Sequence, residues 1–205
     1  MKGVFVGIDI AYKPLRKAKR ILVKYGYDDV DFTVCSVENI PFKTESFDII
    51  TGIFGALDHT KYYLKVFHEI SRLLKKGGIF VFTVLNKFAL DWITKVIINP
   101  RLYIKTIKKA KNVFTRVTIP LPGGGRIRIP THYYNPLEVL NILRKVGMKP
   151  IRKYGIFSIL PANFREKKFR GYHKILCKWE RKLTKVFPFN ILGRYLGIIA
   201  IKMNE

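Results

Sequence analysis

Residues 1–12 read MKGVFVGIDIAY, and this stretch indicates the fold class. The run from Val4 to Ile10 is apolar enough for a buried β-strand and closes on the acidic residue Asp9. A strand with an acid at its carboxyl end is typical of parallel nucleotide-binding sheets, where it usually follows a first strand and a glycine-rich turn. Only three residues precede the run, so we expect an α/β protein that lacks this first strand and turn.

The residues that follow alternate between helical and strand patterns. An amphipathic helix is predicted over residues 12–25, with Pro14 suited to its first turn and Gly26 as its stop. Three further strands are predicted, over residues 30–37, 47–57 and 79–85. A helix over residues 62–76 is predicted between the last two of these strands. Continuous apolar strands that alternate with helices predict a doubly wound, mostly parallel Rossmann-like sheet with helices on both faces.

The alternation breaks between Asn86 and Thr131. An apolar and basic helical stretch over residues 88–114 is followed by RVTIPLPGGGRIRIPT, residues 116–131, which is typical of a hairpin with a glycine-rich tip. We interpret residues 86–131 as a helical and hairpin cap inserted into the sheet domain.

The sheet pattern resumes after the cap. Asn135, Pro136 and Glu138 predict a capped helix start, and a strand is expected around residues 148–156. A basic helix over 173–186 and a last strand over 196–203 complete the chain. We therefore predict a single domain, 1–205, with three parts: a cofactor-binding part (1–85), the cap (86–131) and the remainder of the sheet (132–205).

Composition excludes several classes of protein. The 205 residues are 48% hydrophobic, which is enough for one sizeable core. No apolar run is long enough to span a membrane, and Asp9 interrupts the only stretch that resembles a signal peptide, so a soluble cytoplasmic protein is expected. Cys35 and Cys177 lack the spacing of a disulfide framework or a zinc site, and we predict no metal site.

The net charge of +25 is concentrated in the second part of the chain. Residues 1–84 contain 13 Lys and Arg against 9 Asp and Glu, whereas residues 85–205 contain 26 against 5. No acid lies between Asp91 and Glu138. Such a field attracts polyanions, namely nucleic acid or an anionic membrane surface, or a small anionic substrate.

Four segments in order resemble successive motifs of the class I S-adenosylmethionine-dependent methyltransferases, especially the small-molecule "type 11" branch. They are GIDIA (7–11), VCSVENIPFKTESFDIITGIFGALDH (34–59), EISRLLKKGGIFVFT (69–83) and HYYNPLEVLNILRKVGM (132–148). No single segment is specific to this family, but the occurrence of all four in this order and at these spacings is much stronger evidence for it. The resemblance implies S-adenosyl-L-methionine as cofactor and a sheet of strand order 3-2-1-4-5-7-6.

The resemblance also implies residues that bind the adenosine part of the cofactor. Asp9 is similar to the family carboxylate that accepts hydrogen bonds from both ribose hydroxyls. Ile10 would cover one adenine face. Ser36 stands where the family usually has an acid that accepts from the adenine amino group, and Val37 would offer its amide to the ring. Glu38 is expected to face solvent.

The methyl donor and its acceptor should meet at the carboxyl end of the fourth family strand. Phe54 and Gly55 are expected to line the cofactor pocket, and His59 is a possible base, although a histidine there is more often a capping or surface residue. One of three successive ring side chains is expected to orient a hydroxyl acceptor: His132, Tyr133 or Tyr134. Methyl transfer depends largely on alignment, so the sequence needs no catalytic triad.

The absent first motif has a structural consequence within this resemblance. The family's first strand is central, so its absence leaves two apolar strand edges facing a gap, unless they pair directly or another chain supplies the strand. The glycines at 123–125 cannot replace it because they lie at the hairpin tip. We expect that the natural protein begins upstream, or that the chain is a degenerate or split gene product.

Two functions stay open at this point. The first is a methyltransferase for a small-molecule or lipid-like acceptor, with residues 86–131 as the acceptor cap. The alternative is an RNA methyltransferase or a non-catalytic nucleic-acid-binding protein of the same fold, or an inactive truncated form. An NAD-dependent oxidoreductase fits GIDIA but neither LLKKGGIFVFT nor the helix that starts at NPLEVL.

Overall fold

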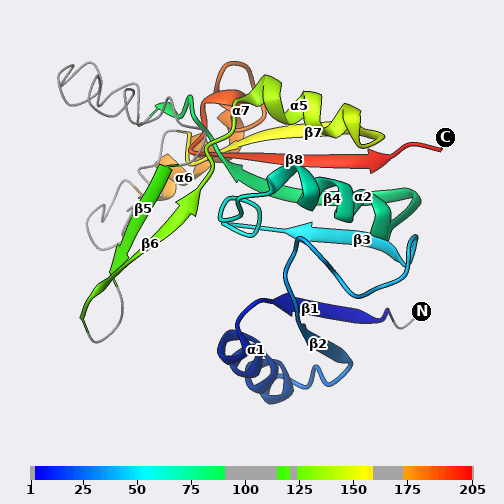
Figure 1. The fold of residues 1–205 in the computed structure, drawn as a ribbon. Helices are drawn as coiled ribbons and strands as arrows, with labels where there is room; N and C mark the ends of the chain where they lie inside the picture. The colour runs from blue at the N-terminus through cyan, green and yellow to red at the C-terminus, as the bar shows by residue number, and fades with distance from the viewer. Residues whose placement is uncertain (1–2, 91–114, 121–123, 159–172, 205) are drawn as a thin grey trace.

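The computed structural model describes residues 3–90, 115–120, 124–158 and 173–204, and the chain forms the mixed α/β fold drawn in Figure 1. The first elements in order are β1 (Phe5–Asp9), α1 (Tyr12–Lys24), β2 (Val30–Val34), β3 (Phe47–Gly52), α2 (Tyr63–Leu73) and β4 (Leu74–Leu85). The later elements are β5 (Thr115–Pro120), β6 (Arg126–Thr131), α5 (Pro136–Lys145), β7 (Met148–Ile156), α6 (His173–Leu183), α7 (Phe189–Leu192) and β8 (Tyr195–Lys202).

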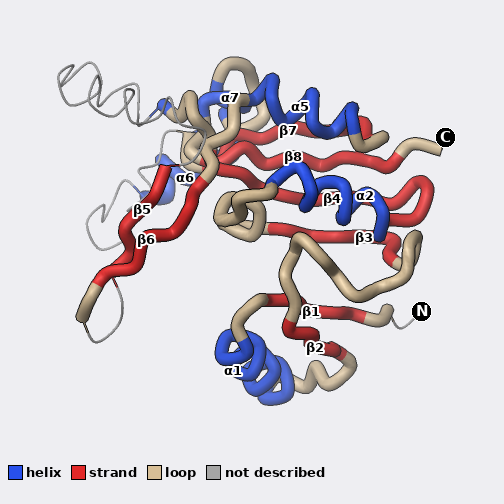
Figure 2. The backbone as a smooth tube through the Cα atoms, viewed as in Figure 1, coloured by secondary structure: helices blue, strands red, loops and turns tan. Residues whose placement is uncertain are grey.

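The strands form a Rossmann-like arrangement in two sections (Figure 2). One section is the parallel pair β1-β2, and the other has the order β3-β4-β8-β7, with β3 parallel to β4 and β8 antiparallel to both of its neighbours. These orders agree with the 3-2 and 4-5-7-6 portions of the order expected from the sequence. Among the described residues no ladder joins β1 to β3, which agrees with the gap expected between these two strand edges.

The main core lies between the four-stranded section and the helices α2 and α5. Alternation along β4 points Phe80 and Phe82 toward these helices, where both side chains are completely buried with Phe67 of α2. The rings of Phe67 and Phe82 meet edge to face at 5.5 Å, a favoured aromatic geometry. Burial of such a side chain contributes about 1.5–3 kcal/mol, so these three rings contribute strongly to the stability of the fold.

The helix after the cap, α5, begins as the sequence predicts. The Asn135 side chain accepts a hydrogen bond from the Leu137 amide at 2.9 Å, and the Glu138 carboxylate accepts one from the Asn135 amide at 3.2 Å. Gly147 follows with a φ of 69°, which favours glycine. The strand predicted over residues 148–156 is likewise confirmed as β7.

The hairpin of the cap is also confirmed. β5 and β6 pair antiparallel from Thr115↔Thr131 to Pro120↔Arg126, and Gly124 and Gly125 at the tip both have positive φ. Most of the helical stretch predicted for the cap, residues 91–114, lies outside the described residues. Among the residues that the structure does describe, no helix has the length and apolar character to cross a membrane.

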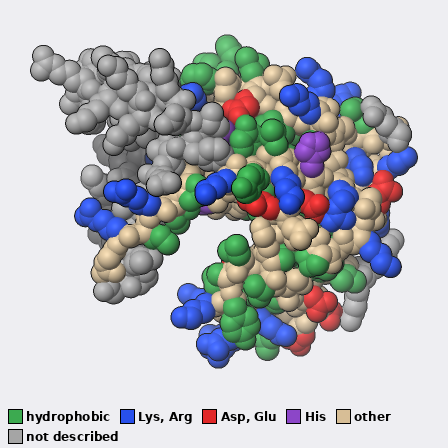
Figure 3. All heavy atoms as spheres, viewed as in Figure 1, with side chains coloured by type: hydrophobic (Ala, Val, Ile, Leu, Met, Phe, Trp, Pro, Cys, Tyr) green, Lys and Arg blue, Asp and Glu red, His purple; other side chains and the backbone are tan. Residues whose placement is uncertain are grey.

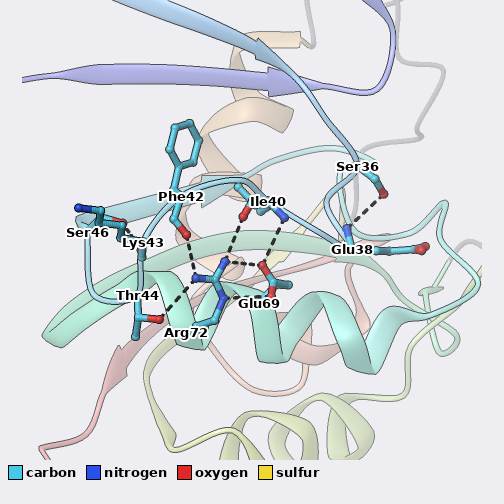
Figure 4. A network of polar contacts seen from close by, with 9 residues as sticks. All are labelled: Ser36, Glu38, Ile40, Phe42, Lys43, Thr44, Ser46, Glu69 and Arg72. Carbon is cyan, nitrogen blue, oxygen red and sulfur yellow. Dashed lines mark hydrogen bonds and ion pairs between the residues drawn. The ribbon is translucent and has the colours of Figure 1, made fainter.

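An arginine fork fixes the crossover from β2 to β3 onto α2 (Figure 4). Arg72 of α2 donates to the carbonyl oxygens of Phe42 at 2.8 Å and Ile40 at 3.0 Å. The same guanidinium forms a two-point pair with Glu69, whose carboxylate also accepts from the Ile40 amide. Two backbone carbonyls and a carboxylate are bound at once by the planar fork of donors that arginine has and lysine lacks.

Replacement of Arg72 by lysine tests this fork. The positive charge stays, but the bonds to the two backbone carbonyls and one bond to Glu69 are lost, so we expect the free energy of unfolding to fall by about 1–2 kcal/mol. Urea unfolding measures this change, with the exposed Lys76→Ala as control. Equal stability of Arg72→Lys and the control would show that the crossover does not depend on the fork.

Candidate functional site

The carboxyl ends of β1 and β2 lie side by side. The Asp9 carbonyl accepts a hydrogen bond from the Cys35 amide at 3.1 Å, which places Ser36 and Val37 next to the end of β1. Asp9 is half-buried as a residue, and its carboxylate Oδ1 accepts an exposed hydrogen bond from the Ala11 amide at 2.8 Å. This bond holds the carboxylate at the strand end.

A notch in the molecule adjoins these strand ends. Figure 3 shows it between the part formed by β1, β2 and α1 and the β5–β6 hairpin, and the carboxyl ends of β1 and β3 point toward it in Figure 1. The helix α1 and the strand β6 carry exposed arginine side chains, namely Arg16 on α1 and Arg126 and Arg128 on β6. Ligands of open α/β sheets bind at such carboxyl ends.

The loop after β3 turns sharply at Phe54. Phe54 has a φ of 51°, an unusual value for a side-chain-bearing residue, and its amide donates to the buried hydroxyl of Thr83 at 2.7 Å. The Phe54 ring is 56% exposed and meets Tyr195 edge to face. It borders a mainly apolar hollow of about 470 Å³, whose lining also includes Ile53, Tyr154 and Ile199.

A buried carboxyl group organises the next residues of this loop. Asp58 is fully buried, and its Oδ1 accepts from the Leu85 amide at the end of β4 at 2.9 Å. Its carbonyl accepts from the His132 amide at 2.8 Å, and the neighbouring Leu57 carbonyl accepts from the Tyr134 hydroxyl at 3.0 Å. The second oxygen, Oδ2, is buried without a hydrogen-bond partner. Burial raises the pKa of Asp58 to about 7.

His59 follows the buried acid and is itself exposed. Its Nδ1 lies 3.2 Å from the Thr131 hydroxyl at the end of β6, and this hydroxyl also lies 3.3 Å from the Ile129 carbonyl. The opposite edge of the ring, with Nε2, faces Gly55, since a Cβ placed on Gly55 would lie 3.4 Å from Nε2. Gly55 and His59, two of the predicted site residues, are thus brought together.

Comparison with known proteins identifies the family. Residues 1–147 match the family described as methyltransferase domain. The chain belongs to this methyltransferase family. A relative from Methanocaldococcus jannaschii, described as an uncharacterized protein, is 34% identical over 152 residues, which are 73% of this chain and 56% of the relative. A ubiquinone biosynthesis O-methyltransferase from Nitrosococcus oceani is 34% identical over 140 residues, 64% of this chain and 58% of that protein.

Solved structures agree with the methyltransferase fold. An S-adenosylmethionine-dependent methyltransferase from Methanosarcina mazei has a TM-score of 0.64 at 17% identity, covering 98% of this chain and 82% of that chain. A similar enzyme from Listeria monocytogenes gives 0.62 at 16% identity, over 97% and 79%. The chain spans a little over half the length of the curated relatives named above.

S-adenosylmethionine is the expected cofactor of a methyltransferase of this family, and the residues present fit its adenosine part. The Asp9 carboxylate can accept from ribose hydroxyls, and the 75% exposed Ile10 side chain is available to cover a purine face. Ser36 Oγ already accepts from the Glu38 amide at 3.2 Å, so it offers less to an adenine amino group than the usual acid. Val37 packs partly against the main core, which fixes its backbone.

The expectation for Glu38 is wrong. Its side chain is half-buried, and its carboxylate accepts a hydrogen bond from the Thr60 hydroxyl. This bond ties the loop after β2 to the loop after β3. Sequence reasoning missed it because the two residues belong to different loops.

The three ring side chains after the hairpin have different surroundings. His132 is 3% exposed, lies 2.9 Å from the Glu138 carboxylate and stacks on Tyr63 at 4.3 Å between ring centroids. Tyr134 is fully buried, so neither side chain is open to an acceptor. This geometry favours structural roles for both. Tyr133 is half-buried, and its contact with an acceptor stays a prediction.

Sequence reasoning also missed Asp58 and Thr131. The sequence did contain a signal for Asp58, because an acid is unusual inside a mainly apolar run such as GIFGALDH. Thr131 had none, since its partner lies 72 positions away. Among the described residues, no cluster of three or more His, Cys, Asp or Glu is arranged to hold a metal ion.

The raised pKa of Asp58 predicts that the free energy of unfolding depends on pH. The unfolded chain ionises this group near its ordinary pKa of 3.8, whereas the folded protein retains the proton up to about pH 7. Between these values the folded state binds more protons, so the contribution of Asp58 to the free energy of unfolding falls as pH rises, by at most about 1.4 kcal/mol per pH unit. Asp58→Asn removes this dependence.

The measurement is urea unfolding of both proteins at about pH 5 and about pH 8. We expect the stability of the wild type relative to Asp58→Asn to be lower at the higher pH, with the exposed Asp31→Asn as control. A difference between wild type and Asp58→Asn that is the same at both pH values would show that Asp58 is not held protonated by the fold.

Proposed function

We propose that the protein is an S-adenosylmethionine-dependent methyltransferase that acts on a small-molecule or lipid-like acceptor. The observation that supports this most strongly is the position of Asp9: a carboxylate at the end of β1, directly beside the end of β2, at the strand ends that adjoin the notch. A carboxylate at this place suits a ribose diol, because an ionised acceptor strengthens both hydrogen bonds.

The roles of the side chains follow from their positions. S-adenosylmethionine, when bound, supplies an electrophilic methyl group on a positively charged sulfur. Asp9 holds the ribose, and Ile10 and Val37 flank the adenine. Phe54 and Gly55, on the loop after β3, line the region where donor and acceptor meet. His59 is exposed next to Gly55 and receives the proton of a hydroxyl acceptor, which is needed because a hydroxyl is a poor nucleophile until it loses that proton.

The acceptor is proposed to be an apolar molecule with a hydroxyl group. Two relatives are ubiquinone biosynthesis O-methyltransferases, from Nitrosococcus oceani and, at 27% identity over 146 residues, Nitrosomonas europaea. The apolar hollow beside Phe54 supports the apolar character proposed for the acceptor. Tyr133 and the cap, residues 86–131, are proposed to contribute to its binding.

A nucleic-acid acceptor is the second candidate, and the charge distribution favours it. The chain has a net charge of +25, and Arg126 and Arg128 are exposed on the hairpin beside the notch. The same positive field also suits an anionic membrane surface that holds a lipid-like acceptor. The small-molecule assignment is preferred because no described element is a recognisable RNA-binding module.

The cofactor assignment is tested by substitution of Asp9. We expect Asp9→Ala to weaken binding of S-adenosylmethionine about 10–100-fold in calorimetric titration, because charge-assisted hydrogen bonds to the ribose are lost. Asp31→Ala, which removes an exposed acid from the neighbouring strand β2, should bind as the wild type does. Equal affinities of wild type and Asp9→Ala, or no binding by the folded wild type, would contradict the proposed site.

The nucleic-acid alternative is tested by salt. Binding of a labelled single-stranded RNA oligonucleotide through phosphates should fall steeply between about 50 and about 200 mM salt, and the double substitution Arg126→Gln and Arg128→Gln should reduce the slope. We expect only weak RNA binding of this nonspecific kind. Tight binding that persists at the higher salt would favour an RNA acceptor over a small molecule.

A further inference from the structure

We propose that Thr131 is a positioning residue that fixes His59 in one tautomer, with the proton on Nδ1 and the lone pair on Nε2. This inference rests on the proposed function only for its consequence in catalysis, since the tautomer itself is a property of the folded chain. It adds a residue from the hairpin strand β6 to a site built from the loop after β3.

The two hydrogen-bond contacts of the Thr131 hydroxyl support a proton on His59 Nδ1. The hydroxyl has one proton, and a carbonyl oxygen can only accept. The 3.3 Å contact with the Ile129 carbonyl therefore requires that Thr131 donate to it. The hydroxyl oxygen then remains as an acceptor at 3.2 Å from His59 Nδ1, so Nδ1 must bear a proton to satisfy this second contact.

The surroundings strengthen this preference. Thr131 is 1% exposed, so few water molecules compete for its hydroxyl. The chain on either side is held in place, because the amide of His132 donates to the Asp58 carbonyl at 2.8 Å. Asp58 and His59 are adjacent in one segment, and Thr131 and His132 are adjacent in the other. The backbone bond therefore joins the two segments that carry His59 and Thr131. The geometry of the histidine–threonine contact is set by this backbone bond rather than by His59 alone.

The consequence concerns the opposite side of the imidazole ring. In the neutral Nδ1–H tautomer, Nε2 carries a lone pair, and this atom lies on the side of Gly55. A Cβ at position 55 would lie 3.4 Å from Nε2, an ordinary contact distance, and the φ of 97° is the feature that favours glycine there. The tautomer fixed by Thr131 therefore presents a proton acceptor to the loop after β3.

In the proposed methyl transfer, the proton of the acceptor hydroxyl goes to Nε2 of the Nδ1–H tautomer. The bond between the methyl carbon and the sulfonium sulfur breaks as the bond between the acceptor oxygen and the methyl carbon forms. The hydroxyl proton of the acceptor passes to Nε2. The products are a methyl ether, the neutral thioether and an imidazolium whose Nδ1–H still donates to Thr131.

Nitrogen-15 NMR of the full chain measures the tautomer without any ligand. In spectra recorded at a pH of about 8.5, long-range proton–nitrogen correlations distinguish a protonated imidazole nitrogen from an unprotonated one. We expect Nδ1–H to predominate for His59 in the wild type, with the signals assigned through their loss in His59→Gln. A predominant Nε2–H tautomer in the wild type would overturn the proposal.

Two substitutions at Thr131 provide the matched pair. Thr131→Val keeps the shape but removes the acceptor, so the ratio of Nδ1–H to Nε2–H should fall about tenfold, the value of one hydrogen bond. Thr131→Ser retains the hydroxyl and should retain the wild-type ratio. An unchanged ratio in folded Thr131→Val would contradict the proposal. If Thr131→Val does not fold, the wild-type and Thr131→Ser spectra still decide the question.

The outcome is separable from that of the proposed function. A protein that binds no S-adenosylmethionine but has His59 as Nδ1–H would refute the enzyme assignment and leave the Thr131 contact intact. Cofactor binding together with an Nε2–H histidine would leave the enzyme assignment and exclude Thr131 as the positioning residue.

Discussion

The buried Asp58 carboxyl group is the constraint on which the arrangement at the sheet edge depends. A carboxylate without full hydrogen bonding is costly inside a protein, so the group must either be neutral or be supported by the backbone. Its Oδ1 holds the end of β4, and its carbonyl holds the segment that follows the hairpin. The loop after β3, the end of β4 and the segment after the hairpin therefore all contact Asp58. The exposed His59 is the next residue, so these contacts determine its position.

The other half of the site depends on a different anchor. The Arg72 fork attaches the β2–β3 crossover to α2, and the bond between Thr60 and Glu38 joins the loops after β2 and β3. Through these contacts the pair β1-β2 is connected to the four-stranded section without a ladder between β1 and β3. Asp9 and His59 thus belong to two sections whose connection is made by side chains and loops.

Local patterns in the sequence predicted much of the fold. The capping box at Asn135, the strand β7 and the hairpin with its glycine tip depend on residues close in sequence, and all three are confirmed. The contacts that shape the site depend on residues far apart, such as Asp58 with Leu85 or His59 with Thr131, and periodicity does not reveal them. The wrong expectation for Glu38 has the same origin, because a loop residue was assigned to solvent without knowledge of the facing loop.

The sequence names candidate site residues by type, whereas the surroundings of each side chain depend on the fold. Asp9, Ile10, Ser36 and Val37 do gather at adjoining strand ends, as parallel topology requires. His132 matched the pattern of an acceptor-contacting ring, yet its stacking on Tyr63 and its pairing with Glu138 bury it. Tertiary packing decides such cases, and the sequence pattern alone does not contain it.

The most direct test of a cofactor site at the strand ends is amide chemical-shift mapping with S-adenosylhomocysteine, the demethylated form of the cofactor. We expect the largest changes at three short segments that follow β1, β2 and β3: residues 9–11, 36–38 and 53–55. Changes confined to the hairpin residues 124–131, or the absence of changes in a folded protein at millimolar ligand, would contradict a cofactor site at the carboxyl ends of these strands.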